Sequence, residues 1–146
     1  MDRRILLAED SANDVELTLN ALRCQNLANE VVVARDGEEA LDYLYRRGVH
    51  AGRPAGNPVL IMLDLKMPRV DGLDVLRAIK GDPDLKMTPV VMLTSSHEQQ
   101  DVIESYRLGV NAYVVKPVNF ASFLDAVERL GLFWLMLNQP PPQTAG

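Results

Sequence analysis

Five polar residues of this chain share one position in the sequence: each lies directly after a short apolar run. These residues are Glu9, Asp10, Asp64, Thr94 and Lys116. Together they offer three carboxylates, a hydroxyl and an ammonium. These are the groups expected where a carboxylate receives a phosphoryl group, because phosphoryl transfer depends mainly on positioning and charge neutralisation. We therefore predict a phosphoryl-transfer site built from these side chains.

The three carboxylates also predict a metal ion. Carboxylates a few ångströms apart repel one another and raise one another's pKa unless a cation joins them. Mg²⁺ suits such a set, since it binds a few carboxylates, keeps several waters and readily accepts a phosphoryl oxygen as a ligand. Lys116 then neutralises phosphoryl charge, and the Thr94 hydroxyl donates to a phosphoryl oxygen. Taken singly, each residue has an ordinary reading as a helix cap or a surface group.

The elements that must position these residues follow from the apolar pattern. The five runs are residues 5–8, 31–34, 59–63, 90–93 and, more weakly, 112–115. They do not alternate with polar residues, as expected of strands buried on both faces. Five stripes with helical spacing follow the runs: Val15, Leu19 and Leu22; Ala40, Leu41 and Leu44; Leu73, Leu76 and Ile79; Val102, Ile103 and Tyr106; and a last one from Phe120 through Leu137, behind an Asn119 cap.

Five strand–helix alternations predict an α/β fold. We expect a flavodoxin-like, doubly wound, five-stranded parallel sheet of order 2-1-3-4-5, with five helices and right-handed crossovers. In such sheets ligands bind outside the carboxyl ends of the strands. Strands one, three, four and five are neighbours in this order, so the five polar residues are expected to meet at one edge. Residues 50–58 form a long loop, which we interpret as a surface insertion.

Four segments together resemble the receiver domain of bacterial two-component response regulators. They are Ile-Leu-Leu-Ala-Glu9-Asp10, Leu-Asp64-Leu-Lys-Met-Pro68 with Asp71-Gly72, Val-Met-Leu-Thr94-Ser-Ser, and Ala-Tyr113-Val-Val-Lys116-Pro117. The resemblance covers about residues 3–130. It implies that Asp64 is the phosphoacceptor, which attacks a phosphohistidine of a sensor histidine kinase.

The resemblance also implies roles for the neighbouring residues. Glu9, Asp10, Asp64 and the backbone carbonyl of Lys66 would hold Mg²⁺ or Mn²⁺, although Glu9 stands where many receivers carry Asp. Thr94, Lys116 and Tyr113 would bind the phosphoryl group or switch with it, and the Lys116–Pro117 bond is expected to be cis. Two alternative interpretations stay open. Tyr113 is an ordinary core aromatic in the first. In the second, Lys66 is a solvated surface lysine, whereas our hypothesis is that it affects the dephosphorylation rate.

The sequence disfavours two alternatives to a phosphorylation switch, a phosphatase and a flavin- or nucleotide-binding protein. A phosphatase of the haloacid-dehalogenase type carries a second Asp two residues after its nucleophile, whereas Lys66 occupies that place here, so leaving-group protonation lacks an acid. We therefore expect no turnover enzyme, beyond weak self-dephosphorylation. A flavin or nucleotide site needs a phosphate-binding turn, but the loop after the first strand is Glu-Asp-Ser-Ala-Asn and contains no glycine.

Length and charge limit the function further. The chain has 146 residues and a net charge of −5, which fits one mildly acidic domain without a DNA-binding output domain. The net negative charge argues against nucleic-acid partners. The longest apolar run, residues 132–137, is far shorter than the roughly 20 residues that a membrane-spanning helix needs. A single cysteine, Cys24, fits the reducing cytoplasm. Such a protein would signal through contacts alone.

The end of the chain differs in composition from the rest. Residues 131–146 carry no charged side chain, so we divide the chain into a receiver domain, 1–130, and an apolar helix extension with a proline-rich tail, 131–146. The long loop and this ending resemble response regulators paired with bacterial and cyanobacterial phytochrome kinases. Phe133, Trp134 and Leu137 either pack under the last helix or form a homodimer through the fourth and fifth helices.

Overall fold

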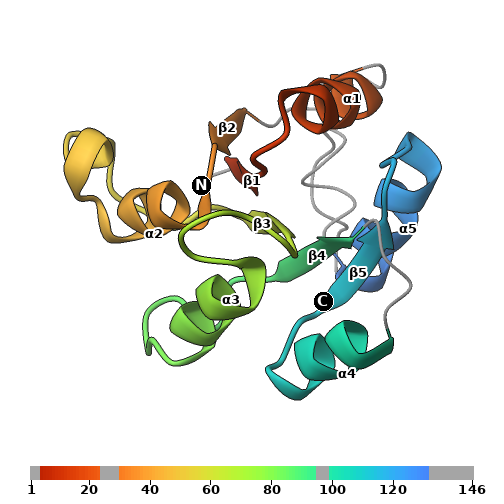
Figure 1. Ribbon diagram of the computed structural model, residues 1–146. Coiled ribbons are helices and arrows are strands. Elements are labelled where there is room, and N and C mark those ends of the chain that lie inside the picture. The colour runs from red at the N-terminus through yellow and green to blue at the C-terminus, as the bar shows by residue number, and fades with distance from the viewer. Residues whose placement is uncertain (1–3, 24–29, 95–98, 132–146) are drawn as a thin grey trace, which may run out of the picture.

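The computed structural model describes residues 4–23, 30–94 and 99–131. Its five strands are β1 (Ile5–Ala8), β2 (Val31–Ala34), β3 (Leu60–Asp64), β4 (Val90–Thr94) and β5 (Ala112–Val115). All four neighbouring pairs are parallel, and the strand order is β2-β1-β3-β4-β5 (Figure 1). The predicted doubly wound sheet and its order are therefore confirmed.

Helices cover both faces of the sheet (Figure 1). They are α1 (Ala12–Arg23), α2 (Gly37–Tyr45), α3 (Gly72–Lys80), α4 (Gln99–Arg107) and α5 (Phe120–Arg129), with a 3₁₀ turn, η1 (Gly48–His50), after α2. Side-chain caps fix several helix starts, since Asp36, Asp71 and Asn119 accept hydrogen bonds from backbone N–H groups of α2, α3 and α5. The cap predicted at Asn119 is thus present.

Two apolar clusters lie on opposite faces of the sheet. One joins the strands to α2 and α3 and includes Ala40, Leu76 and Ile79, while the other joins them to α1 and α5 and includes Val15, Phe123 and Val127. The central strands β1, β3 and β4 are buried along their whole length. Burial on both faces explains why these strands are continuously apolar.

Two residues of the fourth predicted stripe, Ile103 and Tyr106, lie outside the core. Ile103 and Tyr106 on α4 are 57% and 50% exposed, whereas Ser105 of the same helix is buried. The segment is helical as predicted, but the helix turns its small polar Ser105 inward and leaves Ile103 and Tyr106 outside.

The fifth helix is shorter than its apolar stripe predicts. It ends at Arg129, Leu130 is its C-cap, and Gly131 has a φ of 72°. Glycine adopts this left-handed conformation without steric cost, and a helix cannot continue through it. The α5 helix therefore ends before Gly131, the glycine that interrupts the apolar spacing, and the helix extension over residues 131–146 stays a prediction. Residues 132–146 lie outside the described part of the chain.

The long loop before β3 is more than a tolerated insertion. Arg53 donates from Nε to the carbonyl of Tyr43 at 2.6 Å and from Nη2 to that of Leu44 at 3.3 Å, both in the last turn of α2. It also donates to the carbonyl of Gly56 at 2.9 Å. The loop thus supplies a cation for carbonyls in the last turn of the helix, among them that of Tyr43, which also accepts the N–H of Arg46 at 3.2 Å. Among the described helices, none is long and apolar enough to span a membrane.

Candidate functional site

The strand register brings the predicted polar residues to one edge of the sheet. Ala8 pairs with Leu63, so Glu9 and Asp64 follow at the same level on neighbouring strands. Thr94, at the end of β4, pairs with Val115, which places Lys116 directly beyond it. The backbone N–H of Lys116 donates to the carbonyl of Thr94 at 2.7 Å and extends this ladder by one residue. The edge is the carboxyl edge, where open α/β sheets bind ligands.

Gly72 allows the loop after Asp64 to fold tightly over the strand end. Its N–H donates to the carbonyl of Leu65 at 3.0 Å. A Cβ at this position would overlap the carbonyl oxygen of Asp64 and crowd the Cα of Leu65. The side chain of Asp71 caps α3 by accepting from the N–H of Asp74. Close backbone approach therefore requires glycine here and fixes where β3 ends.

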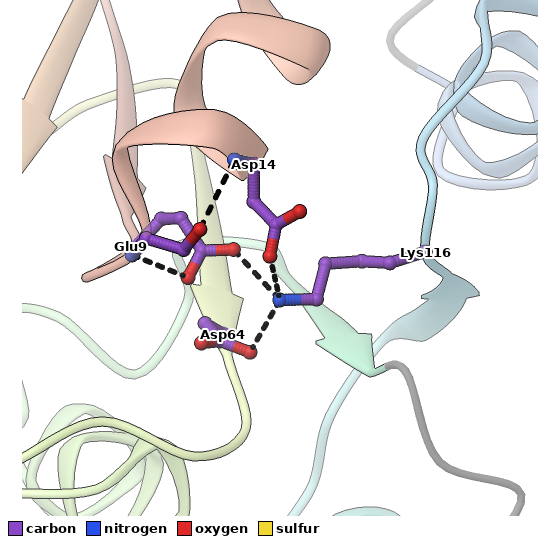
Figure 2. Close-up of polar contacts among 5 residues, drawn as sticks. Glu9, Asp14, Asp64 and Lys116 are labelled. Atoms are coloured by element: carbon purple, nitrogen blue, oxygen red, sulfur yellow. Dashed lines mark hydrogen bonds and ion pairs between the residues drawn. The ribbon is translucent and has the colours of Figure 1, made fainter.

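The ammonium of Lys116 joins the carboxylates of the site (Figure 2). Nζ donates to Glu9 Oε1 at 2.8 Å and to Asp14 Oδ2 at 2.9 Å, and it forms an ion pair with Asp64 Oδ1 at 3.2 Å. The side chain of Lys116 is 10% exposed, so these contacts lie largely out of water. The Lys116–Pro117 peptide bond is cis.

Burial makes the charges of the site strongly interdependent. The pKa of Asp64 rises to about 8, because burial disfavours its charged form and because the neighbouring Glu9 carboxylate repels it, while Lys116 opposes the rise. Burial alone would lower the pKa of Lys116, but hydrogen bonds with Glu9 and Asp14 and the charges of Asp64 and Glu9 raise it above its usual value. Lys116 therefore stays charged.

The same edge fits a divalent cation. Glu9, Asp10 and Asp64 each bring one carboxylate oxygen to within 4.8 Å of the others, with Glu9 and Asp64 buried and Asp10 exposed. Oxygen donors of this kind suit Mg²⁺ and Mn²⁺. Burial and then the neighbouring Glu9 carboxylate raise the pKa of Asp64, and Lys116 opposes the rise without cancelling it. A divalent cation would supply further positive charge.

Asp14 belongs to the cluster although sequence reasoning missed it. It lies in the first turn of α1, where the hydroxyl of Ser11 accepts its backbone N–H at 3.2 Å and caps the helix. Its carboxylate points toward Lys116 (Figure 2). An acid in the first turn of a helix is common because it interacts favourably with the helix dipole, so the residue type and position of Asp14 carried no specific signal of a role in the site.

The remaining predicted residues are distributed around the edge. Thr94 is buried at the end of β4, and the side chain of Lys66 is exposed at the start of the β3–α3 loop. Tyr113 is 41% exposed and packs edge-on against Tyr106 of α4, with ring centroids 5.9 Å apart. The alternative that Tyr113 is a core aromatic is therefore wrong. Phe133, Trp134 and Leu137, the predicted partner surface, lie outside the described residues.

Several known proteins are similar to this chain in both fold and sequence. Residues 5–128 match the family model described as the response regulator receiver domain. The response regulator Rcp1 of Synechocystis is 43% identical over 131 residues, which cover 90% of this chain and 88% of Rcp1. A solved structure described as the Mn²⁺-bound form of Rcp1 is similar to this chain with a TM-score of 0.76 and 40% identity, covering 97% of this chain and 99% of that one.

Two further solved structures carry phytochrome-related names. The bacteriophytochrome response regulator RtBRR is 56% identical with a TM-score of 0.86, covering 97% of this chain and 86% of its own. The phosphorylated cyanobacterial phytochrome response regulator RcpA is 40% identical with a TM-score of 0.77, covering 98% of this chain and 100% of its own. The likeness thus extends over nearly the whole chain.

Proposed function

Because the chain belongs to the response regulator receiver family, we propose that it is a phosphorylation switch in which Asp64 accepts a phosphoryl group from a histidine kinase. One observation carries this proposal. The buried Asp64 carboxylate lies 3.2 Å from the Lys116 ammonium, beside the Glu9 and Asp10 carboxylates. This arrangement combines a nucleophile, a fixed cation and a set of metal ligands at one edge.

The proposed phosphoryl transfer is a single displacement at phosphorus. An oxygen of Asp64 forms a bond to phosphorus while the bond between phosphorus and the donor histidine nitrogen breaks, so that Asp64 becomes an acyl phosphate. Asp64 must be deprotonated to attack, and Lys116 favours that form. Lys116 and the hydroxyl of Thr94 are suited to bind phosphoryl oxygens. Mg²⁺, held by Glu9, Asp10, Asp64 and the backbone carbonyl of Lys66, would neutralise phosphoryl charge.

The same residues support a switch instead of a turnover enzyme. Leu65 and Lys66 follow Asp64, and neither is an acid that could protonate a leaving group. We propose that Lys66, which is exposed at this point of the loop, obstructs attacking water and so affects how long the phosphoryl group remains. We therefore expect slow loss of the chain's own acyl phosphate and no hydrolysis of external phosphate esters.

The output surface of the switch lies on α4 and β5. Ile103, Tyr106 and Tyr113 are all exposed there, and the two tyrosine rings are in contact. We propose that Tyr113 moves inward when the Thr94 hydroxyl turns toward the phosphoryl group, which changes the surface that partners meet. The likeness to phytochrome response regulators supports a phytochrome-type kinase as the phosphodonor, and thus a role in the cytoplasm without nucleic-acid contacts.

Intact-mass measurement with a small phosphodonor tests this function. With Mg²⁺ and acetyl phosphate, the wild-type protein should gain one phosphoryl mass, whereas Asp64→Asn should gain none. Chelation of the metal should suppress the gain. A wild-type protein that remains unmodified under conditions where a known receiver is labelled would refute the proposal, and equal labelling of both proteins would exclude Asp64 as the acceptor.

A further inference from the structure

We infer that Asp14 is a positioning residue of this site and competes with the phosphoryl group for the ammonium of Lys116. The inference rests on the proposed function, since it requires a phosphoryl group on Asp64. Asp14 reaches the site from the first turn of α1 and not from a strand end (Figure 2). It is the nearer of the two aspartates to Nζ of Lys116, at 2.9 Å against 3.2 Å for Asp64.

Lys116 already has several partners that a phosphoryl group would have to share. An ammonium has three N–H donors. Three carboxylates surround it here: those of Glu9 and Asp14 accept hydrogen bonds, and that of Asp64 forms the longest of the three ion pairs. A phosphoryl oxygen on Asp64 can take over the contact of Asp64 itself, but it must then share the ammonium with the charges of Glu9 and Asp14.

Of the three carboxylates, that of Asp14 loses the least free energy when its ion pair with Lys116 breaks. Its side chain is 30% exposed, whereas those of Glu9 and Asp64 are 0% and 8% exposed. Water can replace the ammonium at a partly exposed carboxylate, but a fully buried carboxylate without a partner is strongly unfavourable. Lys116 should thus exchange its Asp14 contact for one with the phosphoryl group. Without the Asp14 charge, that exchange becomes easier.

A purely structural role for Asp14 makes a different prediction. An acid in the first turn stabilises a helix, and the backbone N–H of Asp14 takes part in the Ser11 cap. Asp14→Asn keeps that N–H and nearly the same side-chain volume. If Asp14 served the helix alone, this substitution would lower the melting temperature and leave anion binding at Asp64 unchanged.

Binding of beryllofluoride, an anionic analogue of a phosphoryl group on a carboxylate, tests the inference without any turnover. The analogue is titrated into the full chain with saturating Mg²⁺, and its apparent affinity is measured by NMR. We expect Asp14→Asn to bind about two- to fivefold more tightly than wild type, the size of one partly exposed ion pair. Asp14→Glu, which keeps the charge, should bind as wild type does.

Glu16→Gln is the matched control, because it removes one negative charge from an exposed position two residues further along α1. Equal or weaker beryllofluoride binding by Asp14→Asn than by Glu16→Gln would overturn the inference. Failure of the proposed function gives a separate result: wild type itself would neither bind beryllofluoride nor gain a phosphoryl mass. If wild type binds beryllofluoride and is phosphorylated, but Asp14→Asn binds beryllofluoride with the wild-type affinity, the role of Asp14 is refuted and the proposed function stands.

Discussion

At the scale of single residues, the charge balance around Lys116 governs the site. One buried ammonium faces the carboxylates of Glu9, Asp14 and Asp64, and Asp10 lies close by. Three carboxylates contact this one ammonium, so a bound cation or proton would reduce their mutual repulsion, and burial together with the Glu9 carboxylate raises the pKa of Asp64. Two substitutions test this balance from opposite sides.

Neutralising Asp64 should stabilise the metal-free protein in a pH-dependent way. The folded-state pKa of Asp64 is about 8 against an ordinary value of 3.8, so the folded protein binds this proton more tightly than the unfolded chain. The free energy of unfolding of wild type should therefore fall, relative to Asp64→Asn, as pH rises from 4 to 8. At pH 8 we expect Asp64→Asn to be more stable by up to about 5 kcal/mol.

Urea denaturation at several pH values, without divalent metal, measures this difference. Added Mg²⁺ should stabilise wild type more than Asp64→Asn and so reduce the gap. A difference between the two proteins that stays constant from pH 4 to 8 would contradict the raised pKa.

Removing Lys116 should have the opposite effect. Lys116→Gln leaves Glu9, Asp14 and Asp64 without their shared counter-charge, and breaking a buried ion pair costs about 3 kcal/mol. Chemical denaturation at pH 7.5 should show this loss, and Mg²⁺ should recover part of it. Lys86→Gln, an exposed lysine between α3 and β4, is a suitable control and should be close to neutral. Equal stabilities for the two variants would mean that Lys116 does not compensate the cluster.

At the scale of elements, the sequence was most informative where burial is complete, although the partly buried strands β2 and β5 were also predicted. Strands β1, β3 and β4 were predictable because burial on both faces demands continuous apolar runs. Their register then placed Glu9, Asp64 and Lys116 at one edge. The outward face of α4 was not predictable. Apolar periodicity identifies a helix, but it does not show which side packs inward when a small polar residue such as Ser105 is buried.

Asp14 and the end of α5 show two other limits of the sequence. Asp14 reaches the site through helical geometry, and nothing in its neighbourhood distinguishes it from an ordinary acid in a first turn. The left-handed Gly131 ends a helix whose apolar spacing continues beyond it, so composition alone favoured the longer helix. A glycine near the end of a helical pattern is better read as a stop signal.

The tight turn between β3 and α3 gives a prediction for an element junction. Gly72→Ala would place a Cβ against the backbone of Asp64 and Leu65, so the strand end or the helix start must move. We expect a loss of at least about 2 kcal/mol in the free energy of unfolding, together with weaker Mg²⁺ binding. Gly52→Ala is the control, since a Cβ there would meet nothing within 4 Å. A Gly72→Ala variant as stable as the Gly52→Ala variant would contradict this account.

At the scale of the whole molecule, one sheet edge carries the chemistry and one flank is suited to carry the signal. Lys116 directly follows β5, and Tyr113 on the same strand is exposed beside Tyr106 of α4. A change around Lys116 and Thr94 thus has a short route to the surface. The uncharged residues 131–146 follow α5, the next element along this flank.

This arrangement predicts a homodimer that depends on the end of the chain. Phe133, Trp134 and Leu137 would contribute the apolar contacts, next to the fourth and fifth helices. Sedimentation should show a dimer for the intact chain and a monomer for a chain truncated after Leu130. Monomers in both cases would remove the dimer proposal without affecting the phosphorylation site.

Direct mapping of the modified residue tests the central claim, that Asp64 carries the phosphoryl group. Wild-type protein is phosphorylated with a small donor and Mg²⁺, the acyl phosphate is reduced with borohydride, and the peptides are sequenced by mass spectrometry. Reduction converts a phosphorylated aspartate to homoserine, and we predict homoserine at position 64 alone. A reduced side chain at Glu9, Asp10 or Asp14, with Asp64 intact, would contradict the account.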